Sequence, residues 1–95
     1  MTISIQDIAQ HATKMVRAQR TENFIRKHGN NTIVLFITGN YLIAYEACAI
    51  VLGEILKRHP LKENGITTIE FNTRETDIIF PRVIKRGYKI AILER

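Results

Sequence analysis

The sequence predicts a small α/β domain in which helices pack on a mixed β-sheet. Segments with helical spacing of apolar residues alternate with short runs rich in β-branched residues, which is typical of a sheet with right-handed helical crossovers. A length of 95 residues predicts one domain with a thin core. The composition, 45% hydrophobic and 24% charged, is that of a globular protein.

The first predicted helix spans residues 4–19. Its apolar residues recur at offsets of three, four and seven, which puts them on one face of a helix. They are Ile5, Ile8, Ala9, Ala12, Met15 and Val16. Ser4 is the expected N-cap, and Asp7 suits the positive end of the helix dipole.

The helical spacing is lost after Val16 and resumes at Phe24. We therefore predict a break near Thr21, followed by a short helix that Gly29 closes. The expected division of the chain is an N-terminal helical extension, residues 1–22, and an α/β domain, residues 23–95.

A β-hairpin is predicted next. Residues 33–37 are all apolar and too few for a helix, so residues 32–38 are expected to form a central strand covered on both faces. Gly39 and Asn40 tolerate positive φ and predict a turn. Residues 41–45 are then a returning strand, although their periodicity does not exclude a helix that has already begun there.

A helix is expected from about residue 46 to residue 58, where the following Pro60 stops it. Its predicted buried face is formed by Ala47, Ile50, Val51 and Ile55, with Ala44 or Cys48 extending it. Residues 61–65 are predicted to be a polar loop. Residues 66–71 lack a clean apolar face, but their β-branched content favours a strand.

The last predicted helix spans residues 73–86. Asn72 and Glu75 have the spacing of a capping box at its start. Its expected buried residues are Ile79, Phe80, Val83 and Ile84. Pro81 removes one backbone hydrogen bond and should bend the helix. Residues 88–93 complete the sheet as its final strand.

The residue inventory argues against catalysis. The three histidines are dispersed, no carboxylates are paired, and no glycine-rich phosphate loop is present, so we expect no enzyme, metal or cofactor. The single cysteine, Cys48, excludes an internal disulfide and reads as a small core residue in a reducing cytoplasm. No apolar run approaches the roughly 20 residues that span a bilayer, and no secretory signal is recognisable.

The charge balance favours a polyanionic partner. Fourteen Lys and Arg residues against nine Asp and Glu residues give a net charge of +5. Arg82, Lys85 and Arg86 share the outer face of the last helix, and Lys89 follows in the next strand. Such a stripe can neutralise phosphates, although a solvated face opposite a core stripe has the same pattern.

Tyr41 is a second candidate, because it follows a turn directly after the central strand. An exposed ring there can stack on a base or wedge into a base step, whereas a ring that packs on the sheet has no such role. The candidate DNA-binding residues are therefore Asn40, Tyr41, Arg82, Lys85, Arg86 and Lys89.

Two segments resemble the amino-terminal mismatch-recognition domain of the MutS DNA mismatch repair family. Residues 35–45, LFITGNYLIAY, are similar to its apolar strand followed by Gly-Asp-Phe-Tyr-Glu. Residues 80–94, FPRVIKRGYKIAILE, are similar to its helix followed by Gly-Tyr-Lys-Val-Ala-Ile-Cys-Glu. The resemblance covers roughly residues 23–95 and implies a mixed α/β domain at the DNA minor groove.

The resemblance also implies which residues read DNA. The family's wedging Phe corresponds to Tyr41, the hydrogen-bonding Glu of its Phe-X-Glu motif to Ile43, and the Asp of its Gly-Asp pair to Asn40. Isoleucine cannot hydrogen-bond a base, so the hydrogen-bonding residue of the family's Phe-X-Glu motif has no functional counterpart in this sequence. The family's ATPase domain is absent from the chain as well.

The expected function is that of a stand-alone, non-catalytic domain that binds double-stranded DNA, with distorted or mismatched DNA as its special case. RNA is not distinguished from DNA by charge alone. The alternative is a protein-interaction module that keeps the fold without DNA recognition. In that case the apolar stripe of the 4–19 helix pairs with a second copy in a homodimer, unless it simply folds back on the sheet.

Overall fold

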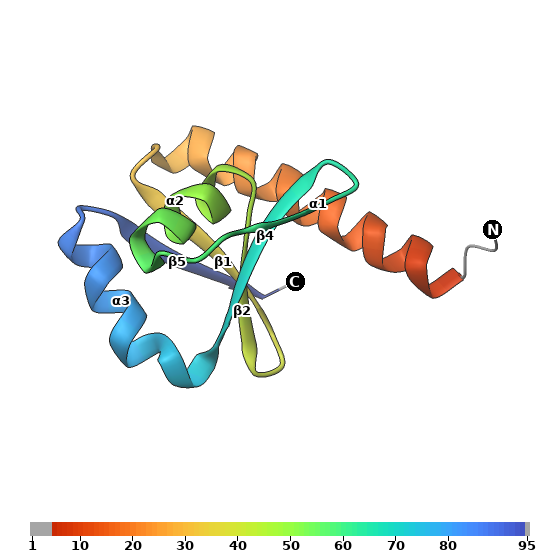
Figure 1. Cartoon of the computed structure of the whole chain (residues 1–95). Coiled ribbons are helices and arrows are strands. Elements are labelled where there is room, and N and C mark those ends of the chain that lie inside the picture. Colours follow the sequence, from red (N-terminus) through yellow and green to blue (C-terminus); the bar gives the residue numbers. More distant parts are fainter. Residues whose placement is uncertain (1–4, 95) are drawn as a thin grey trace.

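The computed structural model describes residues 5–94, and their side chains from residue 11 onward. The elements, in chain order, are α1 (Ile5–His28), β1 (Thr32–Thr38), β2 (Tyr41–Tyr45), α2 (Ala47–Leu56), β3 (Leu61–Glu63), β4 (Ile66–Asn72), the 3-10 turn η1 (Thr73–Glu75), α3 (Thr76–Lys85) and β5 (Lys89–Glu94). These elements form helices packed on one mixed five-stranded sheet, which confirms the predicted class (Figure 1).

The strand order is β3-β4-β2-β1-β5, with β1 antiparallel to β2 and parallel to β5. Residues 32–36 of β1 are all buried, so the predicted central strand is confirmed. The hairpin turn is confirmed too: Thr38 pairs with Tyr41, and Gly39 adopts a φ of 58° that a side chain would disfavour. β2 continues to Tyr45, which excludes a helix beginning inside it.

The helices form two layers, one on each face of the sheet (Figure 1). Side chains alternate between the two faces along a strand. In β1, Phe36 lies under the guanidinium groups of Arg17 and Arg20 from α1, each 5.3 Å from the ring centroid. On the opposite face, Phe71 of β4 contacts Phe80 of α3, with ring centroids 6.4 Å apart. α2 packs beside α3 on that face.

α1 is one uninterrupted helix, so the break predicted near Thr21 is wrong. The Thr21 side chain is buried, and its hydroxyl donates to the Arg17 carbonyl at 2.8 Å, which satisfies the polar group within the helix. The helix ends as expected before Gly29. The division expected between residues 22 and 23 therefore falls inside α1, while the proposed Ser4 cap lies outside the described residues.

Of the apolar stripe of α1, the described residues Ala12, Met15 and Val16 are exposed, contrary to the simpler expectation that the stripe folds back on the sheet, while the side chains of Ile5, Ile8 and Ala9 lie outside the described residues. Met15 is 55% exposed and Val16 is 58% exposed. The helix packs instead through a mixed face in which the stems and guanidinium groups of Arg17 and Arg20 cover Phe36. Farther along, Phe24 and Ile25 pack against the core.

The buried face of α2 differs from the predicted one. Of the four residues expected to be its centre, Ile55 is buried, Val51 is partly buried, and Ala47 and Ile50 are exposed. The observed buried residues are Cys48, Ala49, Leu52, Gly53, Ile55 and Leu56. The buried face thus combines small residues with Leu52, Ile55 and Leu56, and Gly53 packs against the chain that returns through Arg58 and Pro60.

The segment after β4 matches its prediction more closely. The Asn72 N–H donates to the Glu75 carboxylate at 3.0 Å and the Asn72 side chain accepts from the Arg74 N–H at 2.9 Å, which confirms the capping box. Within α3, three of the four residues predicted to be in the core are there: Ile79 and Val83 are buried and Phe80 is partly buried. The fourth, Ile84, is 61% exposed.

The loop predicted over residues 61–65 contains strand β3. It forms a hairpin with β4 in which Glu63 pairs with Ile66 across Asn64 and Gly65. Both turn residues have positive φ, as a type I′ turn requires. The sheet therefore gains a short edge strand beyond β4.

Candidate nucleic-acid interface

Four cations converge in a groove between α2 and α3. The groove has a volume of about 520 Å³ and is lined by Ile55, Lys57, Arg82, Lys85 and Arg86, a set that we call the basic groove. Among the described residues that line it there is no acidic side chain. Three of the cations were predicted from the sequence, and Lys57 was not.

Helix geometry explains why the three α3 and post-α3 cations lie together. Arg82, Lys85 and Arg86 are spaced by three and four residues, so they share one side of the helix. Burial of Ile79 and Val83 fixes the rotation of α3 and turns the cations toward α2. The negative end of the α3 dipole also stabilises positive charge at this place.

Lys57 enters the groove from the end of α2, where the chain turns sharply. Its backbone is left-handed, with φ 56° and ψ 42°. The Arg58 N–H donates to the Gly53 carbonyl at 2.9 Å and the Lys57 N–H donates to the Glu54 carbonyl at 3.4 Å. This pair of bonds is a Schellman motif, which commonly has glycine at the left-handed position.

An ion pair fixes the end of α2 to the start of the α3 segment. The Arg58 guanidinium lies 2.6 Å from the Glu75 carboxylate. This hydrogen bond from Arg58, together with the one from the Asn72 N–H, lowers the pKa of Glu75 from its usual value. The contact links the segment after α2 to the start of the α3 segment.

The other predicted contacts lie elsewhere. Tyr41 is 47% exposed at the β1–β2 turn, on the α1 side of the sheet, because it shares a face with Tyr45, whose hydroxyl accepts from Arg17 at 3.2 Å. Asn40 is exposed in the same turn, and its carbonyl accepts from the Thr73 N–H at 2.8 Å. Tyr41 and α3 are therefore on opposite faces.

Lys89 is also separate from the basic groove. It pairs with Thr32 at the start of β1, and the alternation along β5 puts it on the α1 side of the sheet. Tyr41 pairs with Thr38 at the other end of β1, roughly 20 Å away along the strand. The structure thus brings together Arg82, Lys85 and Arg86, but neither Lys89 nor the turn residues join them.

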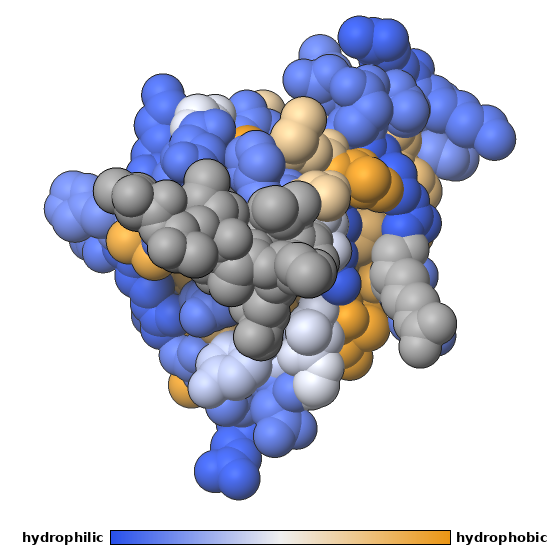
Figure 2. Space-filling view, turned by 90° about the vertical axis from the view of Figure 1, so that its right-hand side faces the viewer, coloured by the Kyte–Doolittle hydropathy of each residue, from blue (hydrophilic) through white to orange (hydrophobic). Residues whose placement is uncertain are grey.

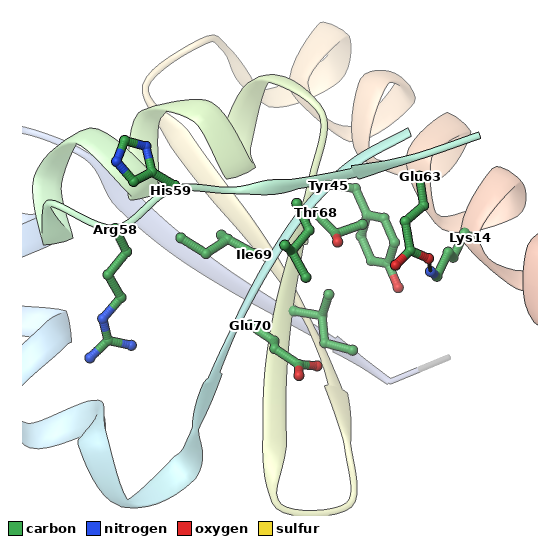
Figure 3. A pocket seen from close by; sticks show the side chains of 10 residues that line it. Lys14, Tyr45, Arg58, His59, Glu63, Thr68, Ile69 and Glu70 are labelled. Carbon is green, nitrogen blue, oxygen red and sulfur yellow. Dashed lines mark hydrogen bonds and ion pairs between the residues drawn. The ribbon is translucent and has the colours of Figure 1, made fainter. Parts of the chain in front are cut away.

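Ile43, the residue in the position of the family's Glu, lies two residues from Tyr41 on the same face of β2. It is partly buried and stands opposite Phe36 and Glu70 in the neighbouring strands. Its side chain lines a pocket of about 360 Å³ on the edge of the sheet (Figure 3).

Charges of both signs line that pocket. Lys14 and Glu63 point toward each other beside Tyr45, 3.0 Å apart, while Arg58 and His59 lie at the far end (Figure 3). Since Lys14 is paired with Glu63 and Arg58 with Glu75, the pocket offers no large excess of either charge. It is a weaker candidate for a polyanion than the basic groove.

Cys48 is a core residue, as predicted. It is buried, its sulfur accepts from the Val34 N–H at 3.5 Å, and its thiol donates to the Thr32 carbonyl oxygen at 3.7 Å. Burial raises the pKa of the thiol, which keeps it protonated.

Among the side chains that the structure describes, from residue 11 to residue 94, no three His, Cys, Asp or Glu residues gather as metal ligands. In the described backbone, residues 5–94, no helix has the length and hydropathy to cross a bilayer.

The chain matches no protein-family model, and it matches no curated protein.

Proposed function

We propose that this chain is a non-enzymatic DNA-binding domain that holds the phosphate backbone in the basic groove. One observation carries the proposal: four cations from two helix ends line one groove, and no acidic residue is among its described lining. The net charge of +5 attracts a polyanion to the surface, and each neutralised phosphate releases counterions. In this role the chain acts as a binding module and performs no chemistry.

The resemblance to the mismatch-recognition domain of MutS supports duplex DNA as the polyanion. On the same ground we propose that residues 23–95 have the fold of that mismatch-recognition domain. Tyr41 and Asn40 remain candidate contacts, but they lie across the sheet from the basic groove, so we assign phosphate binding to the groove alone. With Ile43 in the position of the family's Glu, we expect little discrimination between matched and mismatched duplexes.

A salt-dependent titration tests this proposal. Fluorescence anisotropy with a matched duplex and a G·T-mismatched duplex should detect binding at low salt. With four phosphate contacts, a plot of the logarithm of the affinity against the logarithm of the salt concentration should have a slope of about −3.6. The double variant R82Q/K85Q should weaken binding on the order of tenfold and reduce the slope by about 2.

Three outcomes separate the parts of the proposal. Failure of the wild-type protein to bind either duplex at low salt contradicts it. Equal affinity for the two duplexes removes only mismatch recognition. Tyr41→Ala should leave binding of the matched duplex within about twofold, since an aromatic wedge contributes only where a base step opens.

A second candidate function is self-association through α1. The exposed stripe contains Ala12, Met15 and Val16 and carries no charge, and α1 projects beyond the sheet at its N-terminal end (Figure 1). Seen from that side, the molecule shows a band of apolar surface among mainly hydrophilic side chains (Figure 2). In a protein of net charge +5, an uncharged helix face is the part of the surface where two copies meet with least repulsion.

A further inference from the structure

A second groove adjoins the basic groove at the end of α2. It has a volume of about 600 Å³ and lies between α2 and the β3 segment. Its charged lining residues are Glu54, Lys57, Arg58 and Lys62, with His59 beside them. Because Lys57 lines both grooves, the two lie next to each other at the α2 terminus.

Lys57 occupies a costly backbone position. Only Glu46, Lys57 and Asn64 combine a side chain with positive φ among the described residues, and Asn64 has the turn chemistry that tolerates it. At the left-handed position of a Schellman motif glycine forms the same backbone bonds without strain. What lysine adds there is an ammonium group at the junction of the two grooves.

The charges around Lys57 indicate where a polyanion can pass. Arg58 is engaged by Glu75, whereas the ion pairs found among the described residues include neither Lys57 nor Lys62. Glu54 is the acidic residue on the wall of the second groove, one helical turn before Lys57. A phosphate chain that leaves the basic groove therefore meets Lys57 first and Lys62 next, while Glu54 repels it from the α2 wall.

We propose that the phosphate-binding surface continues from Lys57, at the edge of the basic groove, across the α2 terminus to Lys62 in the second groove. This inference rests on the proposed function and names a longer footprint for the same nucleic acid. The competing explanation is that Lys57 merely complements the negative end of the α2 dipole. In that case its charge stabilises the fold and has no effect on binding.

Lys57→Gly separates the two explanations. Relief of the left-handed strain should leave the melting temperature unchanged or raise it by a few degrees. Loss of the ammonium should weaken duplex affinity by about threefold or more and reduce the salt slope by about 1. A second variant, Lys57→Gln, keeps a polar but uncharged side chain and the left-handed strain, and it should lose binding to the same extent.

Lys62→Gln tests the far end of the surface and should also reduce the slope by about 1. Lys27→Gln is the matched control, because it removes the same charge from the exposed C-terminal turn of α1, on the other face of the sheet. Its affinity and slope should stay close to wild type. Parallel titrations with duplex DNA, duplex RNA and heparin show whether the phosphate-binding surface recognises nucleic-acid geometry or only negative charge.

The outcomes distinguish this inference from the function on which it rests. Unchanged binding in Lys57→Gly and Lys62→Gln, with weakened binding in R82Q/K85Q, overturns the extended surface and restricts the phosphate contacts of the basic groove to its α3 cations. A lowered melting temperature in both Lys57 variants with unchanged affinity assigns Lys57 a structural role and also overturns it. Absence of wild-type binding to all three polyanions defeats both proposals.

Discussion

Gly53 shows how one residue sets the geometry of the binding surface. A Cβ atom at this position would lie 2.8 Å from the Arg58 carbonyl oxygen and 2.9 Å from the Pro60 ring. The chain can therefore fold back tightly over the end of α2 only if residue 53 has no side chain. This close return is what brings Lys57 between the two grooves.

Gly53→Ala should destabilise the protein although alanine is the better helix former. Overpacking against backbone costs about 1–3 kcal/mol, whereas the gain in helix propensity is about 1 kcal/mol or less. We expect a net loss of about 1–2 kcal/mol in chemical denaturation. Ile50→Ala on the exposed face of the same helix serves as the control, with a change within about 0.5 kcal/mol. An unchanged midpoint in Gly53→Ala contradicts the close packing.

At the scale of elements, the end of α2 is linked to η1 by the Arg58–Glu75 ion pair, and Glu75 also belongs to the capping box with Asn72. The lowered pKa of Glu75 makes this connection dependent on pH. A carboxyl group whose pKa is depressed by folding contributes stability above its unfolded value, and that contribution is lost as pH falls through the folded value. The connection should therefore hold at neutral pH and weaken in acid.

Glu75→Gln tests this pH dependence while leaving an oxygen that can accept from the Asn72 N–H. The variant should melt slightly below the wild type at pH 7, because the pair is partly exposed and so contributes little. As pH falls through the lowered pKa of Glu75 in the folded protein, the wild-type carboxyl becomes protonated and the two melting temperatures should converge. A constant difference across the whole pH range would exclude Glu75 ionisation as the cause.

The elements differ in how well sequence could predict them, for physical reasons. β1 was predictable because five consecutive apolar residues suit only a strand covered on both faces. The rotation of α2 was not, because Glu54 is its one charged residue and an almost wholly apolar helix gives no preferred face. β3 was missed even though Asn64-Gly65, a strong hairpin signal, lies in the sequence.

The candidate site was predictable only within one helix. The spacing of Arg82, Lys85 and Arg86 is a local property, and the structure retains it. Lys57 joins them through a left-handed turn and a helix–helix contact, neither of which leaves a periodic signal. The orientation of α1 was hidden for a similar reason, since Arg17 and Arg20 form its contact with Phe36 and look like a solvated face in the sequence.

At the scale of the whole molecule, the orientation of α1 leaves apolar residues of its stripe exposed to solvent. Met15 and Val16 form an apolar ridge that is more than half exposed, with Met15 beside Gly65 and Ile66 at the β3–β4 turn. If two copies bury this ridge against each other, the assembly should depend on concentration and resist salt, because apolar contacts are not screened. The affinity for DNA through the basic groove should instead fall as the salt concentration rises, so the two functions are separable in one protein.

Sedimentation velocity across a concentration series measures this association directly. We expect the sedimentation coefficient to rise with concentration for the wild type and to remain that of a monomer for M15K/V16K, since charges at the ridge must be desolvated in a dimer. Ile84→Lys is the matched control, as Ile84 is similarly exposed but lies on α3, on the other face of the sheet. A wild-type protein that stays monomeric at every concentration contradicts self-association through α1. Because the basic groove lies across the sheet from α1, M15K/V16K should still bind duplex DNA with at least wild-type affinity, and loss of that binding would mean that DNA recognition requires the dimer.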